Sequence, residues 1–69
     1  MNQNNNRIRI GRLIADARHN QGLTVRALAE RSGVSYQNIT KIENGRYNVS
    51  IDILDKLCRA LGLKIVLSG

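Results

Sequence analysis

The chain has 69 residues and carries 11 lysines and arginines against 5 aspartates and glutamates, a net charge of +6. This length predicts one small domain, and the positive charge favours an anionic partner: nucleic acid, a membrane surface or an acidic protein. No apolar run approaches the roughly 18 residues that span a bilayer, so we expect no membrane association. The single cysteine, Cys58, excludes an internal disulfide and a cysteine metal cluster, and indicates a reducing cytoplasm.

The N-terminal part combines an asparagine-rich stretch with a helical pattern. We expect a disordered arm at residues 1–6 and a folded domain over residues 7–69. A first helix is predicted over about residues 8–20, because apolar side chains recur there at helical spacing: Ile10, Ile14 and Ala17. Gly11 within it costs up to about 1 kcal/mol relative to alanine, which a close helix contact would offset.

A cluster of three arginines lies at the start of this helix: Arg7, Arg9 and Arg12. Such a cluster either forms a solvated surface or binds the phosphates of a nucleic-acid strand, and the sequence leaves both interpretations open. Cations near a helix N-terminus oppose the helix dipole, which favours a role outside local stability.

Residues 23–45 predict two short helices joined by a tight turn. The first is expected over about Val25 to Ser32, with Thr24 as its N-cap, because the hydroxyl can accept a bond from a free amide of the first turn. Gly33 follows where the chain must reverse, and glycine takes a left-handed backbone there without steric cost. The segment therefore predicts a helix that ends sharply before a second one begins.

The second helix of the pair is expected over about Tyr36 to Asn44, with Ser35 as its N-cap and Gly45 as its stop. Ile39 and Ile42 are three residues apart and share one face, while polar residues occupy the other faces. A short helix with two apolar anchors and a polar outer face suits insertion into the major groove of DNA.

The C-terminal part predicts a fourth helix and then a strand. Ser50 caps the helix, Gly62 ends it, and its apolar stripe comprises Ile51, Leu54, Leu57, Cys58 and Leu61. The tail from Leu63 onward alternates as a strand does, and a lone strand would leave an open edge. We expect it to pair with the same strand of a second subunit through Lys64, Ile65, Val66 and Leu67; a packed or frayed tail is the alternative. The predicted fold class is therefore an all-α bundle of four helices with a C-terminal strand.

Many spaced residues give the chain a family resemblance: Gly11, Arg18, Gly22–Leu23–Thr24, Leu28–Ala29–Glu30, Ser32–Gly33–Val34–Ser35, Ile39, Ile42–Glu43–Asn44–Gly45 and Ala60–Leu61–Gly62. With these residues, about Ile10 to Leu63 resembles the helix-turn-helix domain of the lambda-repressor and Cro-like family. The resemblance implies a helical bundle whose third helix lies in the major groove, and a two-fold dimer on a palindromic operator.

Carried over by position, the resemblance implies base contacts from Tyr36, Gln37 and Lys41. Gln37 can bond adenine N6 and N7, Lys41 can reach guanine O6 and N7, and Tyr36 can pack its ring on a thymine methyl. Val25 stands where such proteins often carry a phosphate-binding glutamine, so either Arg26 replaces that contact or the contact is lost. The implied contacts to the DNA backbone come from eight residues: Thr24, Arg26, Ser35, Asn38, Thr40, Asn44, Arg46 and Tyr47.

Arg18 and Glu43 occupy positions that form a partly buried ion pair in some members, and the resemblance implies the same pair here. It would orient the third helix rather than add much net stability. Two solvated charges are the alternative. His19 and Cys58 are the only histidine and cysteine, and no glycine-rich phosphate loop is present, so we expect no enzyme, no cofactor and no metal site.

The predicted function is that of a sequence-specific transcription regulator, a repressor that binds double-stranded DNA as a homodimer. A second hypothesis is an antitoxin that binds a toxin protein and represses its own operon, since LCRALGLKIVL resembles the end of certain antitoxins with this domain. A third is a basic domain that binds RNA or membrane without sequence preference. It differs from the first because it predicts equal affinity for random duplexes.

Overall fold

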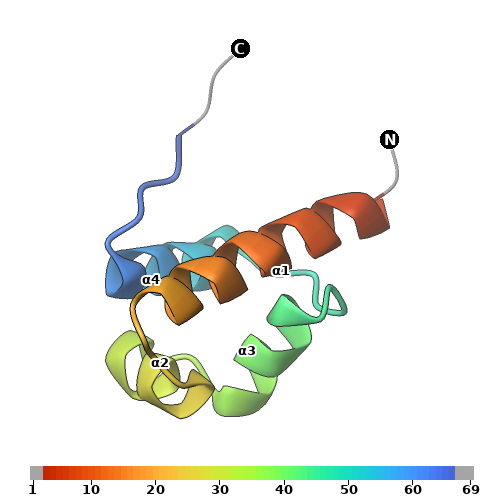
Figure 1. Ribbon diagram of the computed structural model, residues 1–69. Coiled ribbons are helices and arrows are strands. Elements are labelled where there is room, and N and C mark those ends of the chain that lie inside the picture. Colours follow the sequence, from red (N-terminus) through yellow and green to blue (C-terminus); the bar gives the residue numbers. More distant parts are fainter. Residues whose placement is uncertain (1–2, 67–69) are drawn as a thin grey trace.

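The computed structural model describes residues 3–66 and contains four α-helices: α1 (Gln3–Asn20), α2 (Val25–Ser32), α3 (Tyr36–Glu43) and α4 (Ile51–Leu61). α1 packs against α3 and α4, and α2 packs against the same two helices (Figure 1). Over residues 3–66 there is no strand. The structure therefore confirms the all-α bundle of four helices.

The predicted start of each of the last three helices is confirmed by its N-cap. The hydroxyls of Thr24, Ser35 and Ser50 each accept a hydrogen bond from the backbone N–H of the residue three positions later, at 3.0, 3.2 and 3.2 Å. The helix ends are equally defined, since Gly33 and Gly62 adopt φ of +76° and +71°. Local capping chemistry thus explains where these helices begin and where α2 and α4 end.

The core lies where all four helices meet and is aliphatic. Ile51 was predicted to belong to it and does not, because this first residue of α4 is 70% exposed, at a helix end that the rest of the bundle leaves uncovered. The predicted anchors Ile39 and Ile42 of α3 are buried, as is Val34 in the turn between α2 and α3. Among the described residues, the buried hydrophobic side chains of this core are Ile14, Leu28, Val34, Ile39, Ile42, Leu57, Cys58 and Leu61.

The first helix begins at Gln3, earlier than the start predicted near Ile8. The arm expected at residues 1–6 is therefore helical over residues 3–6, and Met1 and Asn2 lie outside the described residues. Tertiary packing explains the longer helix. Ile8 lies directly against Gly45, where an added Cβ would be 2.8 Å from Ile8 Cγ1.

The predicted C-terminal strand is not formed in the single chain. Residues 63–66 have no regular secondary structure, and Leu67 lies outside the described residues. A strand is defined by hydrogen bonds to a neighbour, and no described segment of this chain lies in position to supply one. The tail leaves the end of α4 on the side of α1 opposite to α2 and α3 (Figure 1).

Gly11 sets the distance between α1 and α3. It is buried, and a Cβ built on it would overlap the carbonyl oxygen of Ile42 in the last turn of α3. The close helix contact that would offset the helix-weakening effect of glycine is therefore present. Any larger residue must push the two helices apart.

Replacing Gly11 by alanine should lower the free energy of unfolding by about 1–3 kcal/mol, because steric overlap outweighs the gain in helix propensity. Urea unfolding followed by circular dichroism measures this change. Gly62→Ala is the comparison, since its Cβ would meet no atom within 4 Å and only its left-handed φ is strained. A Gly11→Ala variant as stable as the wild type would contradict the close packing of α1 on α3.

Candidate nucleic-acid interface

α3 presents one apolar face to the core and one polar face to solvent. Ile39 and Ile42 are buried, whereas Tyr36, Gln37 and Lys41 are exposed. Because 3.6 residues make one turn, positions 37 and 41 lie one above the other on the same outer face. The structure thus brings the three predicted base-contacting side chains together on one surface of one rigid helix.

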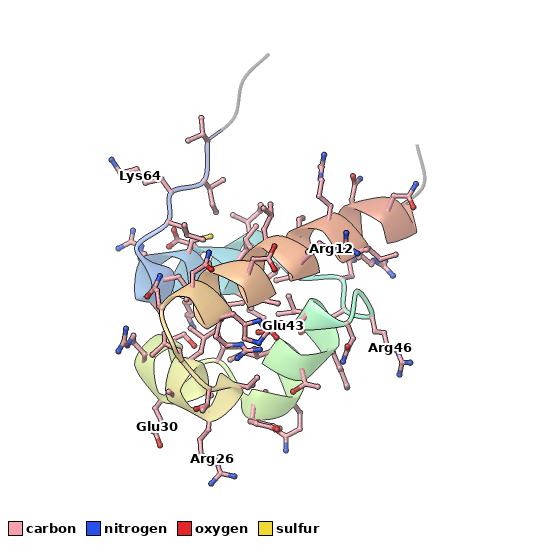
Figure 2. All side chains as sticks on the ribbon, in the orientation of Figure 1. Arg12, Arg26, Glu30, Glu43, Arg46 and Lys64 are labelled. Atoms are coloured by element: carbon pink, nitrogen blue, oxygen red, sulfur yellow. The ribbon has the colours of Figure 1, made fainter. Side chains whose placement is uncertain are left out.

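A second group of predicted site residues surrounds the N-termini of α2 and α3. Thr24, Arg26 and Tyr36, with Val25 and the stem of Arg18, line an open hollow of about 450 Å³. Figure 2 shows Arg26 extending away from the body of the protein. Both helix starts also point unsatisfied amides outward, and such amides bind phosphate oxygens.

The two N-cap hydroxyls keep their own protons available as hydrogen-bond donors. Thr24 Oγ1 and Ser35 Oγ each accept a backbone amide, at 3.0 and 3.2 Å, so their O–H groups remain as donors. Asn38 is half-buried near the start of α3. Thr40 differs, because its Oγ1 donates to the carbonyl of Tyr36 at 3.0 Å. A phosphate contact by Thr40 therefore requires this hydroxyl to rotate.

The remaining predicted backbone contacts lie in the segment after α3. Asn44 and Arg46 are exposed, and Arg46 points outward at the edge of the molecule (Figure 2). Tyr47 is half-buried and packs against the core, which anchors the segment. Gly45, with φ +71°, reverses the chain between them. These residues and the hollow at Thr24 and Arg26 flank α3 at its two ends.

Arg18 and Glu43 form a buried, two-pronged ion pair between α1 and the end of α3. Arg18 Nε donates to Glu43 Oε2 at 2.8 Å, and Nη2 donates to Oε1 at 2.9 Å. The side chains are only 10% and 11% exposed. The structure therefore brings these two residues together in the pairing that the family resemblance implies, and Figure 2 shows Glu43 inside the molecule.

Arg18 has two further polar contacts that the sequence did not predict. Its Nη1 donates to the carbonyl oxygen of Leu23 at 2.8 Å, which ties the turn before α2 to the same guanidinium, and Nη2 lies 3.1 Å from His19 Nε2. A main-chain acceptor carries no side-chain signal, so the sequence could not show the first bond. The hydrogen bonds to Glu43 raise the pKa of Arg18 above its ordinary value. Burial lowers this pKa and the negative charge of Glu43 raises it further, so the guanidinium stays charged at neutral pH.

The described residues contain few other groups that could bind a metal ion or react. Residues 3–66 contain no group of three or more histidine, cysteine or acidic side chains that could hold a metal ion. The thiol of Cys58 is buried, and desolvation, with Asp55 nearby, raises its pKa above the ordinary value. Within the described part, no helix has both the length and the apolar character needed to cross a membrane.

Two capped short helices joined by a glycine turn, with the second helix exposing a polar face between two groups of hydrogen-bond donors, have the arrangement of a helix-turn-helix DNA-binding protein. The helix-turn-helix family model matches residues 14–67, and the chain belongs to this lambda-repressor and Cro-like family. Membership identifies it as a DNA-binding transcription regulator rather than an enzyme.

Individual relatives agree with this assignment. An uncharacterized HTH-type transcriptional regulator of Methanothermobacter thermautotrophicus is 46% identical over 50 residues, which covers 72% of each chain. The HTH-type transcriptional regulator PuuR of Escherichia coli is 34% identical over 55 residues, 80% of this chain but only 30% of PuuR. The transcriptional regulator ClgR of Mycobacterium tuberculosis is 34% identical over 56 residues, 81% of this chain and 50% of ClgR.

Replacing Arg18 by glutamine should lower the free energy of unfolding by about 3–5 kcal/mol, because it leaves the buried Glu43 carboxylate unpaired. Arg59→Gln is the matched control. Arg59 binds Asp55 at a similar 2.9 Å, but their side chains are 82% and 47% exposed, so at most about 1 kcal/mol is lost. Thermal unfolding of both variants gives the comparison, and equal losses would contradict a buried pair.

Proposed function

We propose that the protein is a sequence-specific repressor that binds a palindromic operator as a homodimer. The observation that supports this best is the division of α3 between the buried Ile39 and Ile42 and the exposed Tyr36, Gln37 and Lys41. Occupying an operator is by itself enough to block a promoter. Repression is therefore the activity that a DNA-binding domain performs without any other part.

The three exposed side chains supply different recognition chemistry. The Gln37 amide can donate to adenine N7 and accept from N6, and the Lys41 ammonium can donate to guanine O6 and N7. Tyr36, whose surface is 49% exposed, can lay its ring against a thymine methyl. The groups that flank α3 bind phosphates and set its register, so they contribute affinity without sequence preference.

Replacing Gln37 by alanine should cost about 1–3 kcal/mol of binding free energy at one base pair and relax the preference there. The preferred duplex is first selected from a random pool, and wild type and variant are then titrated against it and its single-base variants. Lys56→Ala, an exposed change on α4, is the control and should leave the profile unaltered. A consensus and affinity unchanged by Gln37→Ala would reject the base contact.

An apolar groove on the far side of α1 supports the homodimer. It has a volume of about 630 Å³ between α1, α4 and the tail. Leu13 and Val66 line it and are 60% and 79% exposed, and Ile65 lies beside them. Exposed apolar surface of this kind in a small basic protein marks a contact surface. The groove faces away from α3, so covering it leaves the polar face of α3 accessible.

The rim of the groove fits a second copy of the same chain. Arg9, Leu13 and Asp16 follow one another along one side of α1, with opposite charges on either side of the leucine. A two-fold axis near Leu13 would set Arg9 of each copy against Asp16 of the other, which makes the surface self-complementary. The tail residues Lys64, Ile65 and Val66 would then pair as antiparallel strands across the same axis.

Replacing Val66 by aspartate should convert the dimer to a monomer, because a charge would enter the proposed apolar contact. Sedimentation velocity at several protein concentrations measures the change. Ile51→Asp is the matched control, since Ile51 is 70% exposed but does not line the groove. A wild-type chain that stays monomeric at micromolar concentration, or a Val66→Asp variant that still dimerises, would reject this interface.

An antitoxin role remains the second candidate function. It is favoured by the sequence of the tail, and the same apolar groove would then contact a toxin protein instead of a second copy. Co-purification of one defined partner that Val66→Asp releases and Ile51→Asp retains would support it. In either role we place the protein in the cytoplasm, which suits a DNA-binding regulator whose lone Cys58 needs a reducing environment.

A further inference from the structure

We propose that the cleft between the start of α1 and the segment after α3 binds a phosphate of the DNA backbone, with Arg7 as its main ligand. This inference rests on the proposed DNA-binding function and extends the interface beyond the helix-turn-helix. We call the site the α1–loop cleft, and its lining residues are Asn6, Arg7, Ile10, Ile42, Tyr47, Asn48 and Val49.

The α1–loop cleft is lined by both apolar and polar residues. Its volume is about 180 Å³. Ile10, Ile42 and Val49 are its apolar lining residues, and Arg7 lines it together with two asparagines and Tyr47. No carboxylate lies among the lining residues. A residue with a cationic donor beside residues with neutral donors suits a phosphate oxyanion.

The cleft is preformed because its two walls are packed together. Gly45 lies against α1, and a Cβ added to it would be 2.8 Å from Ile8 Cγ1 and 3.1 Å from Ile8 Cα. Tyr47 packs against the core from the same segment. Figure 1 shows the first turns of α1 directly beside the loop that follows α3. Arg7 comes from α1 and Asn48 from the loop, so both line the cleft before any ligand binds.

Two features beside the cleft favour an anion over a cation. Asn6 Oδ1 accepts a hydrogen bond from Arg9 Nη2 at 3.3 Å, so the acceptor atom of Asn6 is engaged and its NH2 group can donate outward. The first turn of α1 has no acidic residue, so no carboxylate of that turn offsets the charges of Arg7 and Arg9, which follow in the next turn. A bound phosphate would supply the missing negative charge.

The location of the cleft makes a DNA phosphate the fitting ligand. Its wall at Tyr47 and Asn48 continues directly from Asn44 and Arg46, which the proposed function already assigns to backbone contacts. Arg7 lines the cleft together with Tyr47, which directly follows Arg46 in the chain. Residues 3–13 precede the segment that the family model matches, so membership of the family does not by itself assign a role to Arg7.

The first test is the salt dependence of binding to the selected operator. Each phosphate contact contributes about 0.9 to the slope of log affinity against log salt, so Arg7→Gln should reduce the slope by about 0.9 per subunit. The loss should be equal on operator and random duplexes. Arg46→Gln should behave in the same way, and Arg59→Gln, on the exposed surface of α4, should leave the slope unchanged.

The second test identifies the phosphate. Operators that carry a neutral methylphosphonate at successive positions outside the base-contacted region are titrated with wild type and Arg7→Gln. The wild type should lose affinity several-fold at one position in each half-site, and Arg7→Gln should show no further loss there. Competition by inorganic phosphate alone should be weak, because one phosphate lacks the rest of the duplex.

The outcomes separate this inference from the function on which it rests. A wild type that binds all duplexes alike rejects the proposed sequence-specific function but not the cleft, because the salt slope of wild type and Arg7→Gln is then compared on random duplexes. A wild type that prefers its operator, with Arg7→Gln retaining the full salt slope and the methylphosphonate sensitivity, rejects only the cleft. A lower melting temperature of Arg7→Gln with no change in slope assigns Arg7 a structural role and also overturns the inference.

Discussion

The candidate nucleic-acid interface depends on the contact between α1 and the C-terminal end of α3. α3 has eight residues, and isolated helices of that length are marginal in water, so it is helical because the bundle holds it. Gly11 lets α1 approach the Ile42 carbonyl, and Arg18 binds the next residue, Glu43, with two parallel hydrogen bonds. One contact fixes how close the helices lie and the other fixes their orientation. Together these two contacts determine the direction in which the polar face of α3 points.

Arg18 orients more than one helix. Its three nitrogens reach the Glu43 carboxylate and the Leu23 carbonyl, so one guanidinium links α1, the turn before α2 and the end of α3. Burying this pair gains little net stability, because desolvation offsets most of the attraction. Its value lies in geometry, since a planar guanidinium accepts only a narrow range of partner directions. A lysine at this position could not impose the same alignment.

The residues themselves predicted mainly what local chemistry decides. The Arg18–Glu43 pair joins distant residues, and it was anticipated only through the family resemblance. The N-caps at Thr24, Ser35 and Ser50 and the anchors of α3 follow from neighbouring residues, and the structure confirms them. The early start of α1 could not be predicted, because the asparagine-rich turns are supported by packing of Ile8 on Gly45, far along the chain. The expected strand at residues 63–66 depends on a second chain, which no property of a single sequence supplies.

α1 also connects the two proposed interfaces. Leu13 lies about 200° around the helix from Gly11, so one face of α1 holds α3 and the opposite face borders the apolar groove. This arrangement suits the energetics of operator recognition. Two base contacts at Gln37 and Lys41 would discriminate by about 2–6 kcal/mol, whereas specific sites are typically preferred by about 4–10 kcal/mol. A second copy, held at fixed spacing through the same helix, would double this discrimination, and binding of the second half-site would then be intramolecular. The proposed dimer would thus bring the discrimination of so short a helix into the range that is typical of specific sites.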